Sequence, residues 1–291
     1  MGRRGLPLGA LFALGVVLDA CAPFPTAPGG VSGDHGPEHP VDVSRVPDAV
    51  PGDETPSRYG NPARYTVLGK TYDLVPSCKG YHDRGIASWY GSQFHGGRTS
   101  DGETYDMYAM TAANKVVPIP CYARVTNLQN GKSVVVKIND RGPFVDNRLI
   151  DLSYAAASRL EMLGTGTALV DVQAVTAGEA GAAPAPETPA PSPSVATVVA
   201  AANAPTPVAA RDLNPKIFLQ VGAYAEYANA DAVLQKLAVN GVQKTFVLPA
   251  KENGRTLYKV RIGPVAGVDG VDSLSARLAA LGYPDAQIVI P

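Results

Sequence analysis

Short apolar runs separated by turn residues fill residues 59–175. They are rich in β-branched and aromatic residues, which favours β-strands. The runs are GIASWYG, AMTAAN, YARVTNL, SVVVKIND and ALVDVQAV. One amphipathic segment, SYAAASRLEML, predicts a helix with Ser153 as its N-cap and Gly164 after its end. Many short strands with a single helix predict a small closed or nearly closed β-barrel.

Residues 213–291 show a different pattern, which predicts the order strand, helix, strand, strand, helix, strand. Helical periodicity is clear over 230–238 and 271–281, and Glu252-Asn253-Gly254-Arg255 has the composition of a hairpin turn. Two β-α-β halves of this length predict a small split βαβ, ferredoxin-like fold. The fold class expected for the whole chain is therefore mainly β plus α+β.

Two low-complexity segments divide the chain. Residues 21–58 are rich in Pro, Gly, Asp and Ser and predict a disordered tether, and the Ala/Pro-rich residues 176–212 predict a stiff, extended linker. Two folded units remain, at about 59–175 and 213–291, and each has the length of a domain.

The N-terminus predicts export. Arg3 and Arg4 precede an apolar run over 6–18 that is too short to span a bilayer, so we interpret residues 1–20 as a signal peptide. The run ends at Cys21 in a sequence that resembles a bacterial lipobox, which predicts lipidation of that cysteine, although Asp19 stands where a small uncharged residue is usual. An ordinary cleaved signal is the alternative.

Charge and cysteine content narrow the function further. The formal net charge of −1 and the lack of a Lys/Arg run argue against nucleic-acid binding. In an exported protein, Cys78 and Cys121 are expected to form a disulfide, and closing a loop of roughly 44 residues contributes about 4 kcal/mol in the chain-entropy model. The alternative is a metal site built from Cys78, His82, His95 and Cys121, in which only the first two have ligand-like spacing. We expect no metal and no cofactor.

The strand SVVVKIND ends in a way that suggests chemistry. Asp140 and Arg141 stand side by side where Gly142-Pro143 forces a turn. A carboxylate at this position can project into a groove while the barrel fixes its place. The residues alone leave open a second interpretation, in which Asp140 only caps the turn.

Four segments together resemble the rare lipoprotein A (RlpA) family of septal lytic transglycosylases, namely GIASWYG, GGRTSDGETYDMYAMTAANK, PIPCYARVTNLQNGKSVVVKINDRGPF and NRLIDLSYAAASRL. The resemblance covers about residues 65–175 and implies a six-stranded double-psi β-barrel. It also implies endolytic cleavage of the MurNAc–GlcNAc bond of peptidoglycan without water, leaving a 1,6-anhydro sugar.

The resemblance assigns roles to particular residues. Asp140 becomes the candidate acid and base, Glu103 matches the family's acidic residue in its G-E-x-Y/F-D motif, and Asp151 is a third candidate catalytic carboxylate. Arg141 would orient Asp140 or hold substrate oxygens. From the residues alone, Glu103 can also be interpreted as an exposed glutamate in a hairpin turn, with no catalytic role.

One position departs from the family. Members commonly read T-A-A-H where this chain ends in Asn114. An asparagine cannot shuttle a proton, so Asn114 either orients substrate or a carboxylate, or the enzyme is weak or inactive.

Aromatic residues supply candidate sugar-binding faces in the barrel. Trp89, Tyr90 and Tyr105, with Phe144, could stack on sugar rings, and Trp89 could equally belong to the core.

The C-terminal unit resembles the SPOR domain, which binds glycan strands stripped of stem peptides. The resemblance points to Gln220, Tyr224 and Arg261 on the exposed face of the sheet, where they could also be ordinary solvated residues. The implied partners are stem-peptide-free glycan strands, a membrane through the lipid anchor, and proteins of the division machinery. The implied location is the cell envelope, facing the periplasm, anchored in the outer membrane and enriched at the septum.

Two other classes of function remain open. One is a non-catalytic, expansin-like glycan-binding lipoprotein, and the other is a structural anchor between envelope and septum. Only the enzyme would produce anhydro ends.

Overall fold

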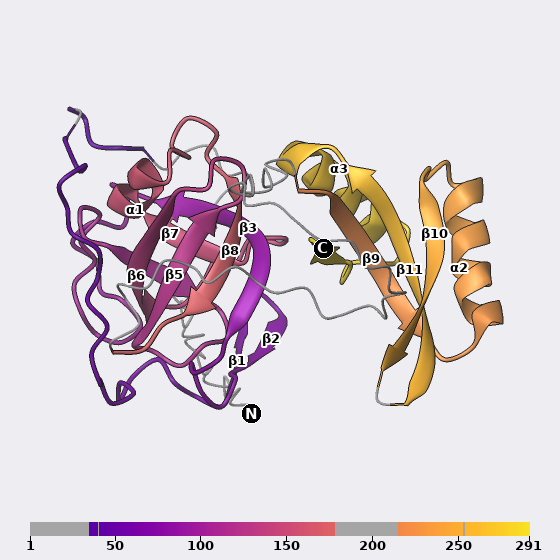
Figure 1. Ribbon diagram of the computed structural model, residues 1–291, viewed down its shortest axis with the longest axis horizontal. Coiled ribbons are helices and arrows are strands. Elements are labelled where there is room, and N and C mark those ends of the chain that lie inside the picture. The colour runs from indigo at the N-terminus through magenta and orange to yellow at the C-terminus, as the bar shows by residue number, and fades with distance from the viewer. Residues whose placement is uncertain (1–34, 40, 178–214, 253) are drawn as a thin grey trace, which may run out of the picture. The chain divides into compact units, whose positions relative to one another are not determined.

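The computed structural model describes residues 35–39, 41–177, 215–252 and 254–291. Six strands form a closed barrel in the order β3-β7-β4-β6-β5-β8 (Figure 1), which confirms the predicted barrel. Their bounds are β3 His82–Tyr90, β4 Thr111–Asn114, β5 Cys121–Asn127, β6 Ser133–Asp140, β7 Ile150–Ser153 and β8 Ala168–Ala174.

Two parallel pairings distinguish this barrel from a simple up-and-down barrel. β3 pairs in parallel with β7, and β4 pairs in parallel with β6, while the remaining four contacts are antiparallel. The interior follows the period-2 pattern of the sequence. Val134, Val136 and Ile138 of β6 belong to the main core cluster, whereas Val135 packs in a separate cluster with Tyr122.

The helix of the barrel, α1 (Tyr154–Arg159), begins where the sequence predicts. Ser153 is its N-cap, and its hydroxyl accepts a 3.2 Å hydrogen bond from the backbone N of Ala156. The predicted end is wrong, because Leu160 is already the C-cap and Glu161 has a φ of 56°. The apolar side chains that suggested further turns of helix still reach the core from irregular backbone.

A two-stranded hairpin outside the barrel was not predicted. Its strands β1 (Arg64–Val67) and β2 (Lys70–Asp73) are antiparallel, with Tyr65 opposite Tyr72. The alternation of half-buried and exposed positions gives the hairpin an inner and an outer face.

The disordered tether predicted for residues 21–58 is wrong for residues 41–58, which lie against the barrel. Val43 is only 3% exposed, and the backbone N of Ala49 donates a 3.0 Å hydrogen bond to the carbonyl of Val135. Asp48 pairs with Arg159 at 2.7 Å. Apolar residues three apart, at positions 43, 46 and 49, provide enough contact for a segment without regular secondary structure.

The C-terminal unit has the predicted order of elements. They are β9 (Ile217–Tyr224), α2 (Tyr227–Val239), β10 (Thr245–Glu252), β11 (Arg255–Val265), α3 (Gly267–Ala280) and β12 (Gln287–Val289). The strands form an antiparallel sheet in the order β10-β11-β9-β12.

One face of this sheet is covered by the helices. Leu219, Val260 and Ile262 of the sheet share a buried cluster with Leu237 of α2 and Leu278 of α3. Because side chains alternate along a strand, the residues between them point to the opposite face. Gln220 and Arg261 lie in register on that face.

Some predicted features fall outside the described residues. These are the signal peptide at 1–20, the lipidated Cys21 with the first part of the tether, and the linker over 178–212. Within the residues that are described, no helix combines the length and apolar character needed to span a membrane.

Candidate active site

Asp140 is the last residue of β6, and its carboxylate is held firmly through one oxygen. Oδ1 accepts hydrogen bonds from the backbone N of Ser100 at 2.9 Å, the hydroxyl of Ser100 at 2.6 Å and the backbone N of Arg141 at 2.7 Å. Only the last belongs to its own turn, so Asp140 does more than cap it. No hydrogen bond to Oδ2 is formed within the described part of the chain, which leaves this oxygen for a substrate.

Ser100 belongs to a tight loop that also carries Glu103. An isolated bridge between Arg98 and Thr104 closes this loop, and the backbone N of Thr99 donates a 2.9 Å hydrogen bond to the carbonyl of Glu103. The loop reaches its turn through Gly102, whose φ of 96° suits glycine. The loop therefore brings the predicted Glu103 to β6, together with Ser100, which the sequence did not single out.

Glu103 contacts β6 through two residues that lie close to Asp140 in the strand. Its carboxylate accepts a 2.7 Å hydrogen bond from Nζ of Lys137 and a 2.9 Å hydrogen bond from Nδ2 of Asn139. The strand is irregular between these residues and Asp140, because Ala112 of β4 pairs with Ile138 while the next residue, Ala113, pairs with Asp140. Burial raises the pKa of Glu103, but the two hydrogen bonds and the charge of Lys137 outweigh it, so the pKa lies below its ordinary value.

Lys137 connects Glu103 to the N-terminal segment. The same ammonium lies 3.2 Å from Oε2 of Glu54, and the other oxygen of Glu54 accepts a hydrogen bond from the hydroxyl of Tyr122. Burial lowers the pKa of Lys137, yet the hydrogen bonds and charges of the two glutamates raise it well above its usual value. Sequence reasoning missed this network because Glu54 lies in the segment expected to be disordered.

Asp151 lies one strand away from Asp140 in a continuous row. Ala113 of β4 is in register with Asp140 of β6 on one side and with Asp151 of β7 on the other. Side chains of such neighbours project from the same face of a sheet. The buried ring of Tyr90 packs with Ala113, and burial, Tyr105 and these two carboxylates raise the pKa of its phenol well above the usual value.

Asn114 does not orient substrate or a carboxylate as predicted. Its side chain is buried, with the residue 1% exposed, and its Oδ1 accepts hydrogen bonds from the backbone N of Val116 at 2.8 Å and of Val117 at 3.1 Å. Its Nδ2 donates to the carbonyl of Leu149 at 3.2 Å. All three partners are backbone groups, so this side chain stabilises the turn after β4.

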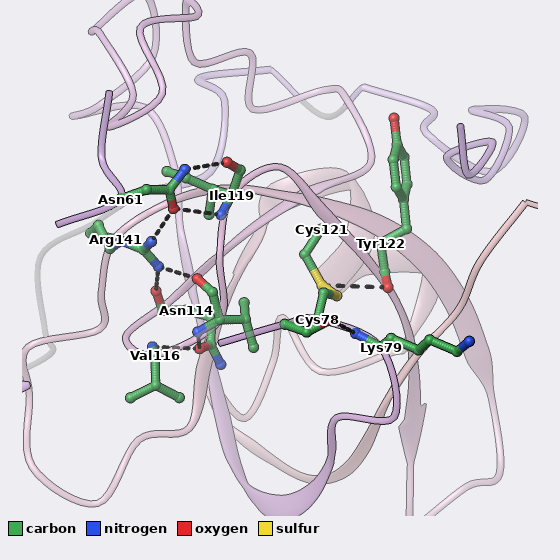
Figure 2. Close-up of a disulfide and its surroundings, with 11 residues drawn as sticks. Asn61, Cys78, Lys79, Asn114, Val116, Ile119, Cys121, Tyr122 and Arg141 are labelled. Atoms are coloured by element: carbon green, nitrogen blue, oxygen red, sulfur yellow. Dashed lines mark hydrogen bonds between the residues drawn. A yellow bond between two sulfur atoms is a disulfide. The ribbon is translucent and has the colours of Figure 1, made fainter. Parts of the chain in front are cut away.

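The guanidinium of Arg141 hydrogen-bonds mainly to backbone carbonyls rather than to Asp140. Its guanidinium donates to the carbonyls of Gly60 at 2.8 Å, Asn114 at 3.1 Å and Val117 at 2.5 Å, and to Oδ1 of Asn61 at 2.9 Å. Figure 2 shows Arg141 directed toward Asn61 and the backbone of Asn114. Burial lowers the pKa of Arg141, with nearby Tyr65 and Asp140 opposing that effect. The guanidinium thus ties the segment before β1 to the turn after β4.

An open groove of about 320 Å³ borders this centre. Ser100 lines it together with Arg141, which connects the groove directly to the hydrogen bonds of Asp140. Its remaining lining is mainly apolar and comes from Gly60, Pro62, Tyr65, Val67 and Phe144. Concave, largely apolar sites with a few polar groups are typical of ligand binding.

Most of the aromatic residues predicted to bind sugar are buried or half-buried in the structure. Tyr90 and Tyr105 are 7% and 3% exposed, and their rings stack at 4.2 Å in a buried cluster. Trp89 is half-buried against the main core and packs edge-on to Tyr154. Alternation along β3 does not separate a sugar-facing ring from a core ring, because the strand is covered on both faces over most of its length.

The structure joins Cys78 to Cys121 in a disulfide, with Cα atoms 6.0 Å apart (Figure 2). This arrangement removes two residues of the alternative metal site. His82 instead lies 2.9 Å from Asp171, and Nδ1 of His95 accepts a 3.2 Å hydrogen bond from the backbone N of Met107. Within the described residues, no group of three potential ligands gathers in a geometry that could hold a metal.

The structure brings together two of the three residues singled out in the C-terminal unit. Nε of Arg261 donates a 3.1 Å hydrogen bond to Oε1 of Gln220 across strands β11 and β9. Tyr224, at the end of β9, is half-buried, and burial is the main cause of its raised pKa. A polar pair on the open face of a sheet is suited to hydrogen-bonding sugar hydroxyls.

Comparison with known proteins gives matches to both units. A family model described as lytic transglycolase matches residues 82–172, and a SPOR domain model matches residues 214–290. The chain is 39% identical to the endolytic peptidoglycan transglycosylase RlpA of Pseudomonas aeruginosa PAO1, over 97% of each chain. It is 35% identical to the protein of the same name from Vibrio cholerae, over 94% of this chain and 93% of the relative. The crystal structure of the RlpA SPOR domain from Pseudomonas aeruginosa is 28% identical, covers 26% of this chain and 99% of its own, and has a TM-score of 0.23.

Proposed function

Because the chain belongs to the RlpA family of lytic transglycosylases, we propose that its barrel cleaves the MurNAc–GlcNAc bond in peptidoglycan strands that lack stem peptides. The product would carry a 1,6-anhydro end. One observation supports this most directly. Asp140 is fixed through Oδ1, while Oδ2 accepts no hydrogen bond from the residues that the structure describes, and the groove borders it.

The chemistry needs one proton donor and one proton acceptor, and a single carboxyl group supplies both in turn. Protonated Asp140 gives its proton to the glycosidic oxygen as the bond from that oxygen to C1 of MurNAc breaks. The C6 hydroxyl of the same sugar then forms the new bond to C1, and its proton passes to the carboxylate. Asp140 ends as it began, and no water enters the product.

The neighbouring acids have different environments and, in this proposal, different roles. Glu103 is held ionised by Lys137 and Asn139, which suits it to stabilise positive charge that develops on the sugar. Asp151 lies across Ala113 from Asp140 and contributes a second carboxylate to the same face of the barrel. Ser100 is a positioning residue, because its backbone N and its hydroxyl both hold Oδ1 of Asp140.

A non-catalytic glycan binder is the second candidate, and Asn114 is the observation that favours it. This residue replaces the histidine common in the family, and its buried side chain hydrogen-bonds to the backbone of Val116, Val117 and Leu149. If the histidine is needed, the groove would still bind glycan while releasing nothing.

We further propose how the enzyme reaches its substrate. Lipidation of Cys21 would tether it to the outer membrane, and the SPOR unit would bind stripped glycan at the septum through Gln220, Tyr224 and Arg261. Two glycan-binding units on one chain raise the local concentration of substrate at the barrel. Proteins of the division machinery are candidate partners at that site.

The decisive experiment is product analysis with stripped glycan and Asp140→Asn. The asparagine keeps an oxygen that accepts the three hydrogen bonds, so the fold should be retained while proton transfer is lost. Wild type should release anhydro-terminated fragments, and the variant should release none but still bind. Release of no anhydro product by wild type would favour the non-catalytic binder.

A further inference from the structure

Two residues of the β1–β2 hairpin, Tyr65 and Val67, line the groove, and Tyr72 packs against Tyr65. Tyr65, Val67 and Tyr72 are half-buried on its inner face, while Thr66 and Thr71 form a 3.0 Å hydrogen bond on its exposed outer face. The rings of Tyr65 and Tyr72 stack at 5.3 Å. A flat aromatic side chain of this kind can pack against the C–H groups on one face of a sugar ring.

Phe144 completes the aromatic wall from the barrel side. Its ring centroid lies 6.3 Å from that of Tyr65 and 5.9 Å from that of Tyr72, at tilted or edge-on angles. Tyr65 is fixed by its hydroxyl, which donates a 2.7 Å hydrogen bond to the carbonyl of Lys115. The orientation of the Tyr65 ring in this wall is therefore fixed.

The hairpin is attached to the barrel at several points, which fixes the wall relative to the catalytic centre. Nζ of Lys70 lies 2.5 Å from Asp146, and the backbone N of Val75 donates a 2.8 Å hydrogen bond to the carbonyl of Val116. The disulfide of Cys78 follows the hairpin directly. An isolated two-stranded hairpin has little stability of its own, so these attachments matter.

The charge next to this wall is positive. The guanidinium of Arg141 lies 6.0 Å from the centre of the Tyr65 ring, and its hydrogen bonds go to carbonyl and amide oxygens. Among the described residues, no carboxylate forms an ion pair with it. Lys70, by contrast, is already paired with Asp146.

These observations lead to a specific ligand. We propose that Tyr65 and Phe144, with Tyr72 packed against both rings, form a subsite for one muramic acid residue, whose lactyl carboxylate lies toward Arg141. The groove of about 320 Å³ is small for a ligand site, which suits one sugar residue. Removal of the stem peptide leaves a negative charge on each MurNAc, so the subsite selects stripped glycan by charge. This inference rests on the proposed function, since it places the substrate beside Asp140.

The test measures binding without cleavage. Full-length Asp140→Asn protein is labelled with 3-fluorotyrosine, and the signal of Tyr72 is identified by its loss in Tyr72→Phe. The probes are a peptide-free GlcNAc–MurNAc tetrasaccharide and chitotetraose, which has the same rings without the lactyl group. We expect the Tyr72 signal to shift with the muramyl probe, with an affinity about tenfold higher than with chitotetraose.

Two further variants complete the test. Phe144→Ala should weaken the titration of Tyr72 by about tenfold, whereas Thr71→Ala on the outer face should leave it unchanged. A Tyr72 signal that does not move, or that titrates equally with both probes, would overturn the subsite. Since the reporter belongs to the hairpin, glycan bound at the C-terminal unit does not imitate the result. Inactivity of the wild-type enzyme would contradict the proposed reaction while leaving this binding measurement intact.

Discussion

Nζ of Lys137 lies 2.7 Å from Oε1 of Glu103, and this contact keeps the carboxylate ionised in the folded barrel. Because the pKa of Glu103 is lower in the folded chain than in the unfolded chain, its ionisation stabilises the fold above the ordinary glutamate pKa. That contribution is lost as the pH falls through the lowered value.

We expect Lys137→Met to raise the pKa of Glu103, because it removes a hydrogen bond and a positive charge while leaving Glu54 nearby. The acid limb of the pH–rate profile of glycan cleavage should move to higher pH. The carboxyl carbon resonance of Glu103 should also titrate at higher pH by NMR. Lys132→Met, which breaks an exposed ion pair with Glu161, is the matched control. Equal titration of Glu103 in both variants would contradict the role given to Lys137.

Asn114→His should destabilise the barrel. Asn114 accepts hydrogen bonds from the part-buried backbone N–H of Val116 and the buried one of Val117, and an imidazole nitrogen accepts only one of them. Leaving one N–H without a partner costs about 1–3 kcal/mol, which thermal or denaturant unfolding would detect. Gln129→His at an exposed position is the control. Unchanged stability together with increased release of anhydro product would show instead that the family histidine fits here and improves the enzyme.

Loss of the disulfide should loosen the hairpin that forms the groove wall. Cys78 and Cys121 are separated by 43 residues in the chain, and removing such a bridge costs about 2–5 kcal/mol. We expect Cys78→Ser with Cys121→Ser to lower the free energy of unfolding in urea by this amount. Non-reducing peptide mass spectrometry should show the two linked, and quantitative alkylation of both thiols in native protein would contradict the bridge.

Arg261→Ala should weaken binding to stripped sacculi through the C-terminal unit, because it removes a cation and its hydrogen bond to Gln220 from the open sheet face. Cleavage of short soluble glycan should stay close to wild type, since the barrel is unchanged. Arg255→Ala, at the exposed start of the same strand, is the control. A co-sedimentation assay in which both variants bind as wild type would exclude Arg261 from the binding face.

Cys21→Ser should move the protein from the membrane fraction to the soluble periplasmic fraction, because the lipidated residue would be absent. Asp19→Ser restores a small uncharged residue before the cysteine and should keep the protein with membranes. Fractionation followed by immunoblotting measures both. Recovery of the wild type as a soluble protein would contradict the anchor.

Periodicity was sufficient to predict most of the strands. SVVVKIND became β6 with its inward valines, and the C-terminal unit has the predicted order because two helical periods alternate with strand periods. Local chemistry also located the start of α1, since Ser153 keeps the extended backbone of an N-cap and its hydroxyl accepts a hydrogen bond from the backbone N of Ala156.

The site was harder to predict because its parts meet only in three dimensions. Asp140 and Glu103 came from the family motif, but their different environments depend on Ser100 and Lys137, which no local pattern marks. Tyr90 and Tyr105 look like sugar platforms in the sequence and form core instead. Tyr65 and Tyr72 lie in two strands of only four residues each, whose position depends on contacts with distant residues.

The two neighbours of β8 have a consequence for how the barrel forms. β8 pairs with β3 on one edge and with β5 on the other. Ala168 of β8 is therefore in register with Ala87 of β3, although most of the barrel sequence lies between them. Until β8 has been synthesised, both of those strands keep an open edge, and no shorter chain closes the cylinder. Pairings between residues so distant in sequence slow folding. Closure of the cylinder therefore requires the whole barrel sequence through the end of β8.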